Sequence, residues 1–326
     1  MNASISTIRL LGALCAVLFF TAASAAENYP TKVIKLVVGY AAGGTADARA
    51  RVFAEVAGTE LGQKVIVDNR PGASGTIAAE FVAKSPPDGY TVLYGTNFEL
   101  ALAPALGQKI AYDPDSSFAP VTGLSTAYFG LFVTPSLGVK TLAEFIALAK
   151  AKPGAVSYGS AGNASMHHFL ADLFCKKVGV EMNHVPYKGE APAITDMLGG
   201  HIQALFTLPS AILPHVNAGK VVPLMAAAPK RLVSLPDIPT AHESGIEGLD
   251  ITAWGGILAP VGTPRHIIVN LNAAFVKARN SPEAMKLPGA EDFGNLAGTP
   301  EAFAAFMKIE RERWVKLVKA SGIKLE

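Results

Sequence analysis

Cysteine is nearly absent from this chain, which has two cysteines in 326 residues. Cys15 lies in an apolar run close to the N-terminus, and Cys175 lies in a stretch that is predicted to be helical. A single cysteine in the body of the chain forms no intrachain disulfide. The sequence therefore excludes a small fold held together by disulfides. A chain of this length with half its residues apolar can instead bury a large core.

The chain has no large excess of charge of either sign, because it contains 28 Lys and Arg residues and 26 Asp and Glu residues. The densest basic cluster, Lys308 to Arg313, is interleaved with Glu310 and Glu312 at helical spacing. This pattern is typical of a solvated helix face rather than a binding patch. A nucleic-acid partner needs a basic stripe, so the sequence excludes that class of protein.

The chain contains no apolar run long enough to span a bilayer. The run Leu10–Phe20 follows a weakly basic start, and Ala23-Ser24-Ala25 behind it fits the small-x-small cleavage rule. We expect residues 1–26 to be a cleaved signal peptide, which predicts export to the periplasm. Leu14 stands where a lipoprotein has a small residue before its Cys15, so a lipid anchor is not expected.

Motifs of common enzyme classes are absent as well. Gly39-x-x-x-Gly43-Gly44 lacks the spacing of a dinucleotide site, and Gly159-Ser160-Ala161-Gly162 lacks the G-x-S-x-G pattern of a serine hydrolase. His167 and His168 are adjacent, so they point to different sides of a helix and do not form a metal site. We expect no enzymatic activity, no metal and no cofactor.

What the sequence does contain is an alternation of strand and helix signals in two blocks. In the first block the predicted elements are strands 33–38, 65–67 and 90–94 and helices 45–61 and 76–84. In the second block a helix opens at Thr141 with a capping box, followed by strands 156–158, 183–185, 202–206 and 221–225 and helices 166–178, 190–198 and 210–218. The tail is predicted to form strand 256–258 and helices 265–278 and 300–321. Such βαβ repetition implies an α/β fold with parallel sheets between helices.

Four glycine- and hydroxyl-rich loops lie where a predicted strand hands over to a helix. They are Tyr40–Asp47, Asn69–Gly75, Tyr94–Asn97 and Tyr158–Ser165. The carboxyl edge of an open α/β sheet is where ligands bind. Helix N-termini offer unpaired N–H groups and a partial positive charge, so they favour anions. A single glycine loop is a weak signal, but corresponding loops in both blocks favour an anion site between them.

The motifs that run along the chain resemble those of the Bug family, the substrate-binding proteins of tripartite tricarboxylate transporters. The resemblance opens at Tyr29-Pro30 and at Val37 to Thr45, with the sequence VVGYAAGGT. It continues through Val67 to Ala73, Pro87 to Thr91, Tyr158 to Gly162, Val185 to Gly189, Asp196 to Gly200, Pro209 to Ala211, Pro214 to Lys220, Leu235 to Thr240, Glu243 to Gly245 and Trp254 to Pro264. The matching segments cover nearly the whole predicted mature chain in order.

The resemblance implies a two-lobed, type 2-like periplasmic-binding-protein fold that closes like a Venus flytrap around its ligand. Each lobe would be an α/β sheet sandwiched by helices, with two crossovers of the chain between lobes. It places lobe 1 at 27–126 and 253–326 and lobe 2 at 127–252.

The resemblance also implies which residues bind the ligand, chiefly through backbone amides and hydroxyls. One wall would be formed by Tyr40, Ala42, Gly43, Gly44, Thr45 and Asp47, with Thr96 and Asn97 beside it. The other would be formed by Ser160, Ala161, Gly162, Ser165 and His168, with Tyr187, Lys188 and Thr207 at the far end. Trp254 is interpreted as hinge packing.

Two departures from the family pattern stand out. Ala42 replaces the usual proline, which predicts a less rigid loop. Thr207 stands where many members carry aspartate, which weakens the case for a ligand with an ammonium group. We therefore expect a di- or tricarboxylate or an aromatic carboxylate, with an acidic amino acid as the alternative.

The expected partners are this small carboxylate and the membrane components of a tripartite tricarboxylate transporter, and a monomer is expected. A ligand-sensing role coupled to a membrane kinase is a further alternative, which would use the same cleft.

Overall fold

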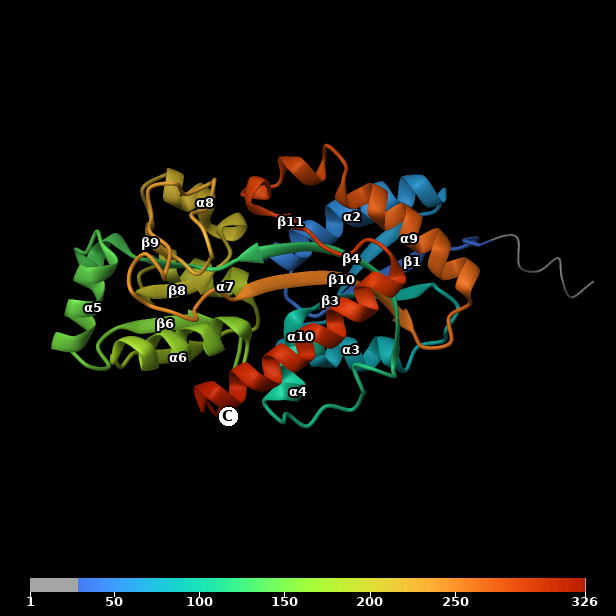
Figure 1. Ribbon diagram of the computed structural model, residues 1–326. Coiled ribbons are helices and arrows are strands. Elements are labelled where there is room, and N and C mark those ends of the chain that lie inside the picture. The colour runs from blue at the N-terminus through green and yellow to red at the C-terminus, as the bar shows by residue number, and fades with distance from the viewer. Residues whose placement is uncertain (1–28, 326) are drawn as a thin grey trace, which may run out of the picture.

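The computed structural model describes residues 29–325, so the predicted signal peptide, 1–26, lies outside the described residues. Two sheets with helices on their faces lie side by side, and we call each sheet with its helices a lobe (Figure 1). The two-lobed α/β fold class expected from the sequence is confirmed. Between residues 29 and 325, no helix combines the length and the apolar character that crossing a membrane requires.

The sheet of lobe 1 has six strands in the order β11-β4-β10-β3-β1-β2. Its strands are β1 (Ile34–Val38), β2 (Val65–Asn69), β3 (Thr91–Thr96), β4 (Phe118–Tyr128), β10 (Thr252–Pro260) and β11 (Gly294–Asn295). Strands β1, β2 and β3 are parallel, as the βαβ pattern predicted. The strands that lead to and from lobe 2 run antiparallel to their neighbours, so the expectation of a purely parallel sheet is wrong.

The sheet of lobe 2 has five strands in the order β7-β6-β8-β5-β9. Its strands are β5 (Gly130–Val133), β6 (Ser157–Ser160), β7 (Asn183–Pro186), β8 (Ala204–Thr207) and β9 (Val222–Ala226). Here too the βα units give a parallel part, β7-β6-β8, while β5 is antiparallel to both of its neighbours. The two lobes thus repeat one architecture, with parallel strands whose carboxyl ends face the gap between lobes.

The helices begin and end where local sequence signals place them. Their bounds are α2 (Thr45–Leu61), α3 (Thr76–Ala83), α4 (Ala103–Ala105), α5 (Leu142–Ala151), α6 (Met166–Val178), α7 (Glu190–Leu198), α8 (Pro209–Asn217), α9 (Arg265–Arg279) and α10 (Pro300–Ser321). Helix α5 opens with the predicted capping box between Thr141 and Glu144. Helix α2 ends at Gly62, whose left-handed backbone suits a residue without Cβ. In lobe 1, α2 and α9 cover one face of the sheet, and α3 and α10 cover the other (Figure 1).

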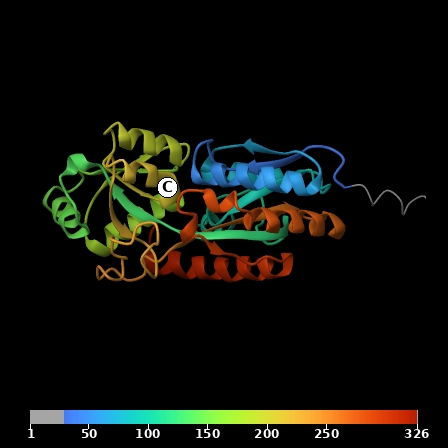
Figure 2. The same ribbon diagram turned by 90° about the horizontal axis from the view of Figure 1, so that it is seen from above.

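The chain crosses between lobes twice through extended backbone. Strand β4 leads almost directly into β5, with Phe129 as the residue between them. The return path follows Ile251 into β10, which pairs with β4 from Thr252 to Pro260. Both crossing strands therefore lie side by side in the middle of the molecule (Figure 1), and the red helix α10 runs along one side of it in Figure 2.

The C-terminal helix α10 adds a third link, because it packs on lobe 1 and also reaches lobe 2. Trp254 on β10 donates its indole N–H to Glu310 at 3.0 Å. Farther along α10, Trp314 lies against Phe169 of α6, with ring centroids 5.6 Å apart. Lys176 of α6 then donates to the backbone carbonyl of Ser321. One apolar cluster accordingly contains residues of both lobes.

Cys175 lies on α6 and is half-buried, and it has no disulfide partner among the described residues. Burial raises the pKa of its thiol to about 12. The thiol is therefore protonated at neutral pH and unreactive, which agrees with a packing role.

Candidate functional site

A cavity of about 80 Å³ lies between the two lobes, where the carboxyl ends of the parallel strands meet. This is several times the roughly 15 Å³ that one water needs, so the cavity has room for a small ligand. Lobe 1 contributes the start of α2 and the end of β3, and lobe 2 contributes the starts of α6 and α7. Within residues 29–325, no group of three or more His, Cys, Asp or Glu side chains is arranged to hold a metal ion.

The first wall is the glycine loop at the start of α2. Gly44 and Thr45 line the cavity. The Asp47 carboxylate lies behind them, where it accepts from the Gly43 N–H at 2.9 Å and from Arg51. Burial raises the Asp47 pKa, but these bonds and one from Asn69 outweigh it and leave the pKa below its ordinary value. Asp47 is therefore an ionised support of the loop and does not line the cavity.

The end of β3 is held by a buried carboxyl group. Glu99 accepts from the Thr96 backbone N–H and from the Thr96 hydroxyl, both at 2.6 Å. The Tyr40 hydroxyl lies 3.1 Å from the Thr96 hydroxyl and also donates to Ser74. Burial raises the pKa of Glu99 to about 7, against the effect of these hydrogen bonds. This network fixes Tyr40 and Thr96 where they line the cavity.

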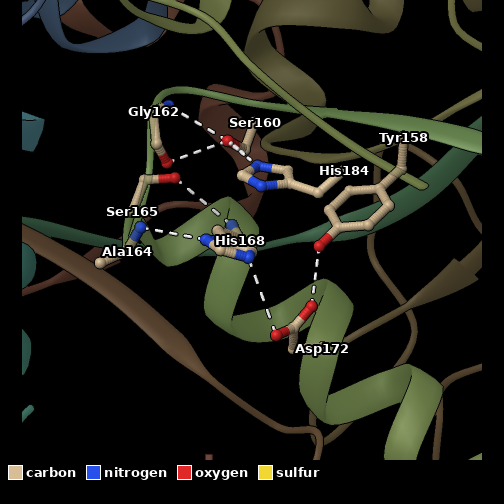
Figure 3. Close-up of polar contacts among 8 residues, drawn as sticks. All are labelled: Tyr158, Ser160, Gly162, Ala164, Ser165, His168, Asp172 and His184. Atoms are coloured by element: carbon tan, nitrogen blue, oxygen red, sulfur yellow. Dashed lines mark hydrogen bonds and ion pairs between the residues drawn. The ribbon is translucent and has the colours of Figure 1, made fainter. Parts of the chain in front are cut away.

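The wall in lobe 2 is the loop between β6 and α6, which Figure 3 shows from its supporting side. The Ser160 hydroxyl is fully buried and turns toward the Gly162 carbonyl, at 2.9 Å, and toward His184 Nε2, at 2.6 Å. His168 accepts from the Ala164 N–H at 3.0 Å and stacks on His184 with ring centroids 3.7 Å apart. These side chains brace the loop from behind rather than facing the cavity.

Both imidazoles of this support are neutral at physiological pH. Burial lowers the pKa of His168 to about 4, and burial together with the neighbouring His168 lowers that of His184 to about 4. Tyr158 and Asp172 close the cluster with a hydrogen bond of 2.7 Å (Figure 3). A neutral His168 is what the Ala164 contact requires, since its Nδ1 accepts there. The residue next to it, His167, faces the other way and lines the cavity.

Glu190, the first residue of α7, joins the lobes across the cavity. Its Oε2 accepts from the backbone N–H of Thr45 in lobe 1, at 2.9 Å. Its Oε1 accepts from the Thr207 hydroxyl, and His167 Nε2 lies 3.6 Å from the same oxygen. Burial raises the Glu190 pKa, but these partners outweigh it and bring the pKa to about 2. An ionised carboxylate of the protein thus occupies the N-terminus of α2.

Arg49 is the cation of the cavity. Its side chain lies one helical turn after Thr45 and is only 4 % exposed. Nη1 donates to the Ser125 hydroxyl at 3.1 Å, and the guanidinium lies 3.5 Å from the centre of the Phe293 ring. Nε and Nη2 are buried and have no hydrogen-bond acceptor among the described residues. Burial lowers the pKa of Arg49, while Tyr94 and Glu190 act to raise it. Arginine nevertheless stays charged in proteins.

The structure brings part of the predicted site together at the cavity and leaves part outside it. Predicted residues that line the cavity are Tyr40, Gly44, Thr45, Thr96, Asn97, Ala161 and Ser165. Predicted residues that do not line it are Ala42, Gly43, Asp47, Ser160, Gly162, His168, Tyr187, Lys188 and Thr207. Of these, Tyr187 donates to Asp196 at 2.7 Å, and Lys188 is exposed. In the sequence, Thr207 in place of an aspartate indicated that the site lacks a carboxylate. The structure places the Glu190 carboxylate beside Thr207, so a carboxylate is present there after all.

Several lining residues were not singled out as ligand contacts. They are Ala46, Arg49, Tyr94, Phe98, Phe129, Met166, His167, Glu190, Leu208, Ala253 and Trp254. Trp254 both lines the cavity and packs on Phe303 and Phe306, so its packing role does not exclude ligand contact. A signal for Arg49 was present, because Thr45, Arg49 and Phe53 are spaced i, i+4 along one buried stripe of α2.

A family model described as "Tripartite tricarboxylate transporter family receptor" matches residues 49–323. The chain belongs to this family. The resemblance seen in the sequence is thereby confirmed, and so is the expectation that the protein is not an enzyme, since the family is one of receptors.

Individual members of the receptor family match along most of the chain. Protein BugT of Bordetella pertussis is 32 % identical over 320 residues, which cover 98 % of each chain. The solved structure of periplasmic binding protein BugD is 30 % identical with a TM-score of 0.87, over 90 % of this chain and 99 % of that one. The structure of Rpa4515 from R. palustris with adipate is 34 % identical with a TM-score of 0.85, over 91 % of this chain and 99 % of that one.

The Glu190 contact predicts a contribution to the receptor's stability that acid removes. The carboxyl has a pKa of about 2 in the folded protein against an ordinary 4.5. Because the folded pKa is the lower one, the stabilisation is complete above about pH 5 and is lost as the pH falls toward 2. A shift of this size corresponds to about 3 kcal/mol. When the pH is lowered from about 5 to 2, the free energy of unfolding measured with denaturant should fall by about 3 kcal/mol more in the wild type than in Glu190→Gln. Equal losses in the two proteins would contradict an ionised Glu190.

Proposed function

We propose that this receptor captures a small organic carboxylate between its lobes and delivers it to the membrane components of a tripartite tricarboxylate transporter. It does so in the periplasm, after removal of residues 1–26 as a signal peptide. The two lobes, 27–126 with 253–326 and 127–252, close around the ligand, and the predicted wall residues that line the cavity contact it. The observation that carries the proposal is the cavity itself, whose polar groups come from both lobes. The adipate bound by a relative of matching fold supports a carboxylate.

Closure is the mechanism that this arrangement supports. Each lobe alone presents half of the cavity wall, so a ligand that touches both walls binds the closed state in preference to the open one. Contacts across the gap include Thr45 with Ser210, whose hydroxyls lie 3.2 Å apart, and Ser74 with the Asn163 carbonyl at 3.1 Å. These bonds form only when the lobes meet.

The test is small-angle scattering together with calorimetry on the mature protein. A carboxylate that binds by calorimetry should reduce the radius of gyration of the wild type. Gly44→Val should not become compact, because a Cβ at Gly44 already lies 3.5 Å from Glu190 Oε2 and the further methyl groups extend into the interlobe contact. A wild-type radius that stays fixed at saturating ligand would refute closure, and an absence of binding by any carboxylate would refute the function.

A further inference from the structure

Arg49 lines the cavity and, within residues 29–325, has N–H groups without an acceptor, which suit an anion. The two nitrogen atoms without an acceptor, Nε and Nη2, form one edge of the planar guanidinium. The two N–H groups of such an edge are parallel and match the two oxygens of a carboxylate. Nη1, on the other side, is already bonded to Ser125. A buried guanidinium with N–H groups that lack an acceptor destabilises the protein. This edge is therefore suited to a ligand that supplies the missing acceptor atoms.

The second natural position for an anion is already filled by the protein. The N-terminus of α2 offers the Thr45 N–H and the positive end of the helix dipole, which together favour a carboxylate. Glu190 from the opposite lobe occupies this place and bonds to that N–H. A second ligand carboxylate would have to displace Glu190 or lie beside its negative charge in a cavity that excludes water.

The remaining wall is mainly apolar and, among the described residues, contains no further lysine or arginine. Apart from Arg49, none of the lining residues is a lysine or an arginine. Aromatic and aliphatic side chains from both lobes make up much of the surface: Tyr94, Phe98, Phe129, Met166, Leu208 and Trp254. Such a wall stabilises an apolar group by burial and leaves a second charge without compensation.

We propose that the ligand of this receptor carries one carboxylate, bound to Nε and Nη2 of Arg49, on an apolar body, and that Glu190 excludes ligands with a second carboxylate. This rests on the proposed function and narrows it. Arg49 is the anchor, and Glu190 determines specificity by holding the position that a dicarboxylate would need. Among the ligands expected from the sequence, the proposal thus favours an aromatic carboxylate with one acid group over a di- or tricarboxylate.

The experiment compares ligands that differ only in the second carboxylate. The probes are hexanoate against adipate and benzoate against terephthalate, titrated by calorimetry into wild type, Glu190→Gln and Arg49→Met. Glutamine keeps an acceptor for the Thr45 N–H and places an amide donor beside the Thr207 hydroxyl, and it removes the charge. Methionine fills the space of Arg49 without leaving a buried charge. Thermal melting of each variant checks that it is folded.

We expect the wild type to bind the monoacid of at least one pair roughly tenfold or more tightly than its diacid. Glu190→Gln should reduce this ratio at least about tenfold by strengthening the diacid. Arg49→Met should weaken the monoacid by about ten- to a hundredfold. A wild type that binds either diacid as tightly as its monoacid would overturn the proposal while leaving carboxylate capture intact. Failure of all four probes would overturn this narrower proposal, whereas the proposed function fails only if no carboxylate binds.

Discussion

Replacing Trp314 by alanine is expected to lower the free energy of unfolding by about 3–5 kcal/mol, as large aromatic truncations in cores do. Trp314 is 3 % exposed although it lies on the C-terminal helix. Its ring meets Phe169 of lobe 2 edge-on, so the substitution opens a cavity where α10 joins the two lobes. Both the core and the link between lobes lose contacts together.

Chemical denaturation measures this effect, and neighbouring substitutions control it. Trp314→Phe should cost much less than the alanine variant, because the indole N–H has no hydrogen-bond partner among the described residues. Val315→Ala, on the exposed side of the same helix, should change stability by about 0.5 kcal/mol or less. A loss for Trp314→Ala no larger than that for Val315→Ala would show that α10 does not pack on lobe 2 in solution.

Adding one methyl group at Gly39 is expected to destabilise the protein by about 3 kcal/mol, at the upper end of what overpacking costs. A Cβ at this position would lie 2.5 Å from the Gly75 Cα and 3.1 Å from the Gly75 carbonyl oxygen. Both are backbone atoms, so no side chain can move aside. The loop that ends at Gly75 must shift as a whole, and with it Ser74, which accepts from Tyr40 and donates to Asn163 of lobe 2.

A second glycine nearby provides the matched control. A Cβ at Gly44 would meet Glu190 at 3.5–3.6 Å, which is ordinary van der Waals contact, and the Gly44 φ of −86° suits any residue. Gly44→Ala should therefore melt close to the wild type, while Gly39→Ala melts well below it. Similar melting temperatures for the two variants would mean that the β1 and α3 loops are not in contact as described.

The helices were largely predictable because their ends carry local chemistry. Helices α2, α6, α7 and α10 occupy the ranges predicted from apolar spacing and terminal residues. Gly62 and Gly179 end α2 and α6 with left-handed backbone, and Ser165 accepts from the His168 N–H at the start of α6. These signals act within a few residues, so they do not depend on the rest of the fold.

Strands β4 and β5, which form the first crossing between the lobes, were not predicted, and β10 is longer than the predicted strand 256–258. Strand β4 contains Pro120 and Gly123, which weaken any single-strand pattern. Its length is set by pairing with β10 over Thr252–Pro260, a contact far apart in sequence. Strand β5 has only four residues, all buried. Propensity over a short window does not detect strands whose stability comes from distant partners.

The site was predictable at the level of loops but not of side chains. The glycine loops before α2 and α6 do form opposite walls of the cavity. The family pattern could not indicate Arg49 and Glu190, because their roles depend on a contact between lobes. Glu190 begins α7 in lobe 2, yet its partner is the Thr45 N–H, 145 residues earlier. Conversely Ser160 and His168 have the expected chemistry but use it on their own loop.

The seating of α10 on both lobes constrains the mechanics of the molecule. Two neighbouring strands alone act as a flexible ribbon that permits both bending and torsion. The contacts of Trp314 with Phe169 and of Ser321 with Lys176 join α10 to α6 at a distance from these two strands. Any rotation of one lobe against the other about these strands therefore has to break or shift the contacts between α6 and α10.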